Sequence, residues 1–156
     1  MIHLDWQSYG SASALSTYAK TSGDVLERLK ERYVAAMVRK AMREWLEFFD
    51  GVDALVKGGA AEEVTYHMNF NKAAAKKMAD KCTMKEMQKQ VDALRKKVGK
   101  QFTSATATQH LVPSLWDGIA HVYLDHVDRF RQLLSVAYRN TVQLDVTRND
   151  VAPLFD

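Results

Sequence analysis

The sequence contains little cysteine, glycine or proline, and it has no long apolar run. Its single cysteine, Cys82, excludes an intramolecular disulfide framework and suits a reducing compartment. Only seven glycines and two prolines interrupt 156 residues, which favours long helices. No stretch approaches the roughly 18 consecutive apolar residues of a membrane-spanning helix. The sequence therefore predicts no spanning segment.

The sequence also lacks the usual signatures of a catalytic triad, a phosphate-binding loop or a metal site. Asp117, His121 and Asp125 recur at four-residue steps and could share one polar helix face. A metal site in a helical bundle needs ligands that converge from facing helices, usually with Glu-x-x-His pairs, and the sequence has none. Cys82 has no convincing histidine partner. We therefore predict no catalytic, cofactor-binding or metal site, and a protein that is not an enzyme.

Length and composition indicate a single folded domain with an uneven charge distribution. A hydrophobic content of 47% with 26% charged residues argues against disorder. The formal net charge is +3, but residues 72–100 hold ten Lys and Arg against three Asp and Glu. The segments on either side are slightly acidic. The basic excess therefore lies in one segment, which points to an acidic partner or to a solvated face.

Apolar residues recur at three- and four-residue steps along most of the chain. This pattern predicts an all-α fold, a mostly antiparallel bundle of about five to six helices. Residues 1–23 are a weakly patterned lead-in, either a marginal helix or an extended stretch, and residues 24–156 form a single helical-bundle domain. The first long helix is expected from Asp24 to about Val56. It should stop at Gly58-Gly59, where left-handed backbone geometry is available to glycine.

Capping signals predict the helices in the middle of the chain. A short helix is expected over residues 60–68, and Asn71 should cap the next one. Thr83 and Glu86 form a capping-box pattern. The helix that follows has the cleanest apolar stripe in the chain, at Met84, Met87, Val91, Leu94, Val98 and Phe102.

The C-terminal part is predicted to hold one long helix and one short helix. Residues 103–109 are polar and unpatterned, so we expect a loop there. A second long helix should run from about Leu111 to Asn140, with Pro113 in its first turn. Residues 141–146 alternate like a strand, but a lone strand cannot satisfy its backbone groups, so we expect an extended linker. Thr147 and the residues after it resemble a capping box that opens a short last helix.

Two sets of residues are the candidates for the core and for a contact surface. The expected core aromatic and aliphatic residues are Trp45, Phe48, Leu94, Trp116 and Phe130. The second set, called here the lysine stripe, lies opposite the apolar stripe and consists of Lys85, Lys89, Lys96 and Lys100. An ordinary solvated helix face has the same geometry. The functional alternatives are anionic membrane lipid, an acidic protein face or nucleic acid. Nucleic acid is disfavoured, because no aromatic side chain lies among the lysines to stack on bases.

Two ordered blocks carry a resemblance to a known family. The first is Phe48-Phe49-Asp50-Gly51-Val52-Asp53, and the second runs from Glu62-Glu63-Val64-Thr65-Tyr66 to Phe70-Asn71-Lys72. Together they resemble the C-terminal region of the exocyst complex component 1 family. The lysine-rich helix at residues 87–101 and the aromatic-bearing helix at residues 111–138 are similar to the helices that follow there. The turn at residues 137–140 and Pro153 depart from the family pattern.

The resemblance implies a fold, a function and a location. Family members are longer proteins with an N-terminal domain that binds phosphoinositides and Rho GTPases, a coiled coil, and helical-bundle domains of the CATCHR type. This chain would correspond to the C-terminal bundle and would lack the N-terminal lipid and GTPase sites. It would act without catalysis or cofactor in vesicle tethering, through contacts with other exocyst subunits. Its expected location is cytoplasmic, peripheral at the plasma membrane or on secretory vesicles.

Overall fold

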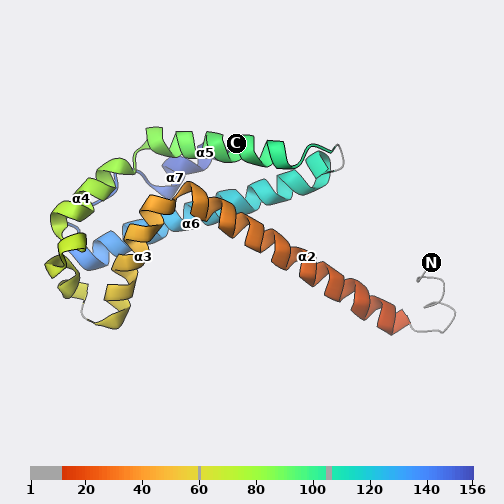
Figure 1. Ribbon diagram of the computed structural model, residues 1–156, viewed down its shortest axis with the longest axis horizontal. Helices are drawn as coiled ribbons and strands as arrows, with labels where there is room; N and C mark the ends of the chain where they lie inside the picture. The colour runs from red at the N-terminus through yellow and green to blue at the C-terminus, as the bar shows by residue number, and fades with distance from the viewer. Residues whose placement is uncertain (1–11, 60, 105–106) are drawn as a thin grey trace.

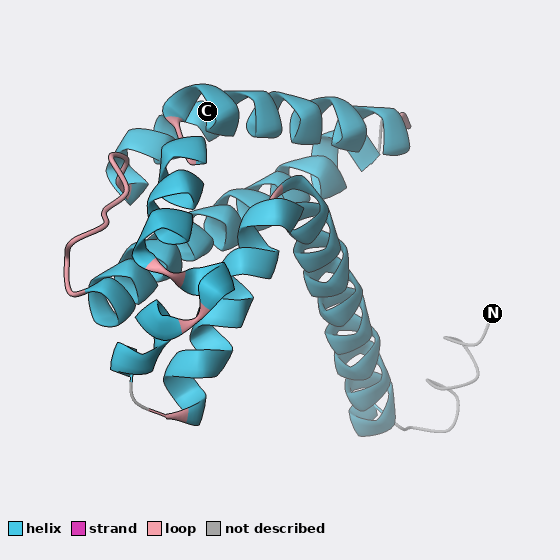
Figure 2. Cartoon of the chain, turned by 60° about the vertical axis from the view of Figure 1, so that its left-hand side comes forward, coloured by secondary structure: helices cyan, strands magenta, loops and turns pink. Residues whose placement is uncertain are grey.

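The computed structural model describes residues 12–59, 61–104 and 107–156, and all regular structure within these residues is helical. Figures 1 and 2 show the helices from two directions. The elements are α2 (Ala12–Ala41), α3 (Arg43–Gly58), the 3₁₀ segments η1 (Ala61–Tyr66) and η2 (Met68–Phe70), α4 (Lys72–Lys81), α5 (Met84–Gln101), the π-helical turn η3 (Ala107–Leu111), α6 (Val112–Tyr138), α7 (Arg148–Val151) and the 3₁₀ segment η4 (Ala152–Phe155). The predicted all-α helical bundle is confirmed.

Helix α6 is the central element of the fold. It contacts α2, α3, α5, α7 and η1, and Figure 1 shows it passing behind the α2–α3 pair and below α5. Pro113 lies in its first turn, as predicted. Gly118 allows α2 to approach closely, because a Cβ atom there would lie 3.1 Å from Cγ2 of Val34. The core is therefore built on α6.

The predicted first long helix is divided at Met42, which corrects the expectation of one helix from Asp24 to Val56. Helices α2 and α3 run in clearly different directions (Figures 1 and 2). Met42 has φ −105° and ψ 19°, yet its N–H donates to Val38 and its carbonyl accepts from Leu46. All three side chains are buried. The hydrogen bonds and the apolar spacing thus continue across the bend, so the periodicity could not reveal it.

Three smaller expectations also need correction. Helix α3 ends at the predicted glycines, but Gly59 is extended, with φ −177°, and not left-handed. The predicted helix over residues 60–68 is instead two 3₁₀ segments separated by an extended His67. The predicted loop over residues 103–109 lies partly outside the described residues, and its end belongs to the π-helical turn η3.

The predicted caps are present, one of them only in part. The Asn71 side chain accepts a hydrogen bond from the first turn of α4. The Thr83 hydroxyl accepts from the amide of Glu86 at 3.2 Å, whereas the Glu86 carboxylate pairs with a lysine one turn further on. Thr147 and Asp150 form a complete capping box. Side chains thus satisfy amides that a helix leaves free in its first turn.

Residues 141–146 form a linker without helix or strand, as predicted, but the chain bends at residues 141, 142 and 145 and is not extended throughout. Val142, Leu144 and Val146 are buried beneath it. The guanidinium of Arg131, on α6, donates to the carbonyl oxygens of Leu144 at 3.1 Å and Val146 at 2.8 Å. An arginine therefore supplies the hydrogen bonds that a neighbouring strand would have supplied.

The residues expected in the core lie at different depths. Trp45 and Leu94 are buried, and Phe130 is fully enclosed and stacked on Phe49 with ring centroids 4.2 Å apart. Phe48 and Trp116 lie half-buried at the edge and pack against the core. The Trp116 indole donates to the carbonyl of residue 155 at 2.7 Å, so a polar contact holds this edge.

Helix α2 extends away from the other helices over its first half (Figure 1). Residues 12–23 of the expected lead-in belong to this helix, and residues 1–11 lie outside the described residues. Val25, Leu26 and Leu29 are each about half exposed on it. Within the described part of the chain, no helix has the length and apolarity needed to cross a membrane.

Candidate functional site

The two sequence blocks that carry the family resemblance pack directly against each other. The ring centroid of Phe48 lies 5.4 Å from that of Phe70 and 5.2 Å from that of Phe49. Gly51 lies directly against Phe70: a Cβ atom at position 51 would lie 2.4 Å from Cζ of that ring. Real Cβ contacts essentially never fall under 3.0 Å. Because Gly51 has no side chain, the Phe70 ring can occupy the space that a side chain at position 51 would need.

The second block is also attached to the end of α6. The hydroxyl of Tyr138 donates to the carbonyl oxygen of Phe70 at 2.7 Å. Val64, from the same block, is fully buried, and Arg139 pairs with Glu62 at the surface. We name the set Phe48, Phe49, Gly51, Phe70 and Phe130 the interlocked region. Its contacts join α3 and η2 to α6, which comes much later in the sequence.

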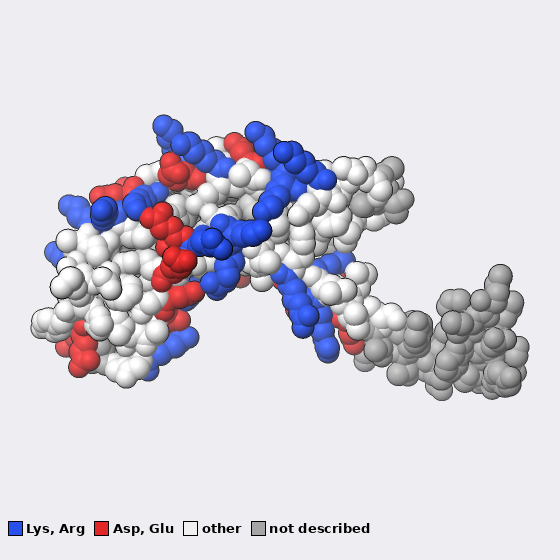
Figure 3. Space-filling view, in the orientation of Figure 1, with Lys and Arg blue, Asp and Glu red and all other residues white. Residues whose placement is uncertain are grey.

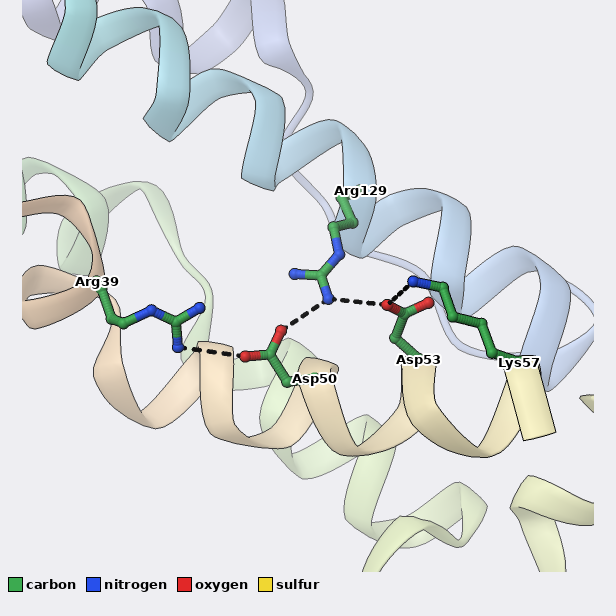
Figure 4. A network of polar contacts seen from close by, with 5 residues as sticks. All are labelled: Arg39, Asp50, Asp53, Lys57 and Arg129. Carbon is green, nitrogen blue, oxygen red and sulfur yellow. Dashed lines mark hydrogen bonds and ion pairs between the residues drawn. The ribbon is translucent and has the colours of Figure 1, made fainter. Parts of the chain in front are cut away.

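The acidic residues of the first block hold α3 to α6 and to the end of α2 (Figure 4). Arg129 on α6 donates to Asp50 at 2.7 Å and to Asp53 at 3.3 Å. Arg39, on α2, reaches Asp50 at 3.3 Å across the bend, and Lys57 pairs with Asp53 at 3.0 Å. This network therefore spans the bend at Met42.

The network shifts the titration of both carboxylates. Burial by itself would raise the pKa of Asp50, but the hydrogen bonds and charges of Arg129 and Arg39 outweigh it and lower the pKa. The pKa of Asp53 is lowered first by its hydrogen bond to Lys57 and also by Arg129, against a small opposing effect of burial. Both groups therefore stay ionised at neutral pH and act as structural counter-ions.

The four residues of the lysine stripe are exposed on α5. Within the described part of the chain, Lys89 alone of the four has an ion-pair partner, Glu86 at 3.4 Å. Figure 3 shows basic side chains gathered where α5 passes above the end of α2, with acidic ones beside them over α3. Lys89 lines the same groove as Lys40 and Lys97, so the stripe borders a basic face that α5 shares with α2.

Two further lysines on that face were not predicted as site residues. Lys97 lies on α5 beside the stripe, and Lys40 lies on α2. The positive charge of Lys40 lowers the pKa of Lys97. The sequence shows both lysines, but they are 57 positions apart, so only the packing of α2 on α5 brings them together. No local pattern could have paired them.

The remaining candidate groups have structural surroundings. Cys82 is buried, and burial together with the charge of Glu44 raises the pKa of its thiol to about 12, which makes it unreactive. His121 lies 3.6 Å from Asp125 on an exposed face, and Asp125 also accepts from Arg148 at 2.8 Å. In the described ranges, no three His, Cys, Asp or Glu side chains gather closely enough to hold a metal ion.

Comparison with known proteins gives one family. The family model described as exocyst complex component Sec3, C-terminal, matches residues 5–140. The chain is similar to exocyst complex component 1 of Mus musculus, with 28% identity over 78% of this chain and 13% of that protein. It is also similar to exocyst complex component SEC3A of Arabidopsis thaliana, with 24% identity over 83% of this chain and 14% of that protein.

A third relative extends the same comparison. Exocyst complex component 1 of Dictyostelium discoideum is 19% identical over 83% of this chain and 14% of that protein. The chain thus spans 13–14% of the length of these relatives. No solved structure matches the chain.

Proposed function

Because the chain belongs to the family of exocyst complex component Sec3 C-terminal regions, we propose that it is a non-catalytic helical module of the exocyst. In this role it supports the tethering of secretory vesicles to the plasma membrane through contacts with other exocyst subunits. The module is of the CATCHR type. It works in the cytoplasm, as a peripheral component at the plasma membrane or on secretory vesicles.

The match to the family over residues 5–140 is the observation that carries this proposal, and the interlocking of the two blocks supports a scaffold role. Residues of the two blocks that resemble the family fill space, as Phe70 does against Gly51, or hold helices together, as Asp50 does with Arg129. Such residues maintain a scaffold and are not arranged around a reacting group. A tethering subunit needs this property, because it transmits position between partners and has no substrate to transform.

Affinity capture with the intact chain as bait tests the proposal. Exocyst subunits should be enriched over a helical bundle of similar size and net charge expressed at the same level. A second bait, Phe130→Ala, should lose the enrichment if the fold carries the contacts, since Phe130 is fully buried. Equal recovery of exocyst subunits with the chain and with the unrelated bundle would contradict the proposal.

The exposed lysines favour a second function, weak binding to anionic membrane lipid through residues 72–100. Each basic residue near an anionic surface contributes about 1 kcal/mol at low salt, and screening reduces this at physiological ionic strength. The chain should therefore sediment with acidic vesicles at low salt and much less at physiological salt.

A pair of matched variants locates the lipid contact. Reversal of Lys85, Lys96 and Lys100 to Glu should abolish sedimentation, whereas reversal of the three exposed lysines Lys72, Lys76 and Lys77 on α4 should weaken it less. Both variants have the same net charge, so they differ only in which helix loses its positive charge. Equal losses in the two would assign the effect to net charge and remove the stripe as a site.

A further inference from the structure

A groove with an apolar floor and a basic rim lies where the end of α2 packs against α5. Its volume is about 290 Å³. Met37 and Leu94, which are buried, form its floor together with Ala41. Lys40 stands on the α2 side, and Lys89 and Lys97 stand on the α5 side. We call this feature the basic groove.

The rim of the groove carries positive charge with little compensation. Within the part of the chain that the structure describes, no aspartate or glutamate lines the groove. Among the described residues, Lys40 and Lys97 have no ion-pair partner, and Lys89 has only the exposed Glu86. Lys40 is close enough for its charge to lower the pKa of Lys97. Two facing ammonium groups repel each other, and a carboxylate placed between them would relieve that repulsion.

The floor and the rim together indicate the chemistry of the occupant. An apolar side chain would cover Met37 and Leu94, while acidic neighbours in the same segment would reach the lysines. An amphipathic helix laid in a groove presents this combination at positions three and four residues apart. A phosphate group fits less well, because the rim has no arginine fork and the mid-helix amides of α5 are bonded within the helix.

We propose that the basic groove docks an acidic amphipathic segment of another exocyst subunit, with one apolar side chain on the floor and carboxylates between Lys40 and Lys97. The inference rests on the proposed function and adds the surface and the class of partner. Electrostatic complementarity of this kind selects the partner and speeds association. The lysine stripe contributes to the groove only through Lys89.

A photo-cross-linking experiment in cells tests the groove directly. A photoreactive side chain at Ala93, which is exposed and lines the groove, should attach to an acidic segment of an exocyst subunit. The same group at Ala73, exposed on α4, is the control and should not. The cross-linked peptides are identified by mass spectrometry.

Charge variants measure the contribution of the rim. Lys40→Glu with Lys97→Glu should reduce recovery of the cross-linked subunit about tenfold, equivalent to about 1.4 kcal/mol. The matched control Lys72→Glu with Lys76→Glu should leave recovery unchanged. Circular dichroism checks that each variant is folded, and Lys40→Gln with Lys97→Gln replaces the reversal if it is not.

The alternative results separate the groove from the proposed function. Subunits recovered equally by wild type and by the Lys40/Lys97 variant would overturn the groove and leave the proposed function intact. No exocyst subunit recovered by wild type would overturn both. If the variant loses sedimentation with acidic vesicles but still recovers the subunits, the occupant is a lipid headgroup, which contradicts the proposal.

Discussion

The interlocked region and the basic groove are both made where helices meet, but they differ in how their space and charge are used. In the interlocked region the rings of Phe49 and Phe130 stack in the buried core, and the neighbouring Asp50 pairs with two arginines. In the groove the floor is apolar, and Lys40 faces Lys97 with no carboxylate from residues 12–59, 61–104 or 107–156 on the rim. The first region is complete within the chain, whereas the second would be completed by a partner. The recognisable sequence blocks thus mark the scaffold and not the proposed contact surface.

The largest effect should come from truncating the centre of the interlocked region. Phe130→Ala should lower the free energy of unfolding by about 3–5 kcal/mol, because the ring is fully enclosed and its loss leaves a cavity. Urea denaturation measures the change. Lys96→Ala, on the exposed stripe, should stay within about 0.5 kcal/mol of wild type. If the two variants were equally stable, the packed and exposed regions would not differ as described.

The fit of Gly51 against Phe70 should give the next largest effect. Gly51→Val should destabilise by about 1–3 kcal/mol, since the added methyl groups overlap the ring. Gly99, in the last turn of α5, has open space on the side where a Cβ atom would lie, with no atom of another segment within 4 Å. Gly99→Val should therefore change the unfolding free energy by less than about 0.5 kcal/mol. Equal denaturation midpoints for the two variants would show that Phe70 moves aside freely.

The ion network should contribute less and should depend on pH. Arg129→Gln should cost about 1 kcal/mol at neutral pH, because the pairs are partly exposed and screened. Because the pKa values of Asp50 and Asp53 are lowered in the folded chain, their ionised carboxylates stabilise the fold at any pH above the unfolded pKa of about 3.9. This contribution is lost as the pH falls through the lower folded values.

Denaturation midpoints at pH 7, 4.5 and 3 check the pH dependence. The difference between wild type and Arg129→Gln should shrink as the carboxylates are protonated. Arg139→Gln is the control, because its pair with Glu62 is about 70% exposed on both sides and should contribute little at any pH. A constant difference for Arg129→Gln across the three pH values would remove the network from the account.

The smallest expected effect is a slight stabilisation, whereas the variants above are expected to destabilise the fold. Replacing Lys40 with Gln removes the charge that faces Lys97, so the denaturation midpoint should rise slightly. The rise should be greater at low salt, where the repulsion is less screened. A fall in the midpoint would mean that Lys40 stabilises the free chain, and the groove would then lack the unfavourable charge that a partner is proposed to relieve.

Periodicity and capping chemistry predicted most helices because they depend on residues close in sequence. The stripe Met87, Val91, Leu94 and Val98 is buried on one face of α5, and Asn71 caps α4 as its side chain suggests. The bend at Met42 was missed because the three- and four-residue spacing of buried residues continues through it. The 3₁₀ segments η1 and η2 pack against α3, and η1 also packs against α6; local propensity shows neither these contacts nor the 3₁₀ geometry.

The candidate surface was predicted only in part, because sequence patterns show residues on one helix but not which helices pack together. The lysine stripe belongs to one helix and could be read from one stretch of sequence. The basic groove needs two helices, and Lys40 lies on the segment that was expected to continue straight into α3. Only the packing of α2 on α5 brings Lys40 to Lys97, and local sequence patterns do not show which helices pack together.

Hydrogen exchange of the chain, free and assembled with the other exocyst subunits, tests the central comparison most directly. Backbone amides of α3 around Phe49 and of α6 around Phe130 should be strongly protected in the free chain and change little on assembly. Amides of residues 37–41 and 89–97 should become slower to exchange only in the complex. Slowing confined to other surfaces, or no slowing anywhere, would contradict the assignment of packing to one region and partner binding to the other.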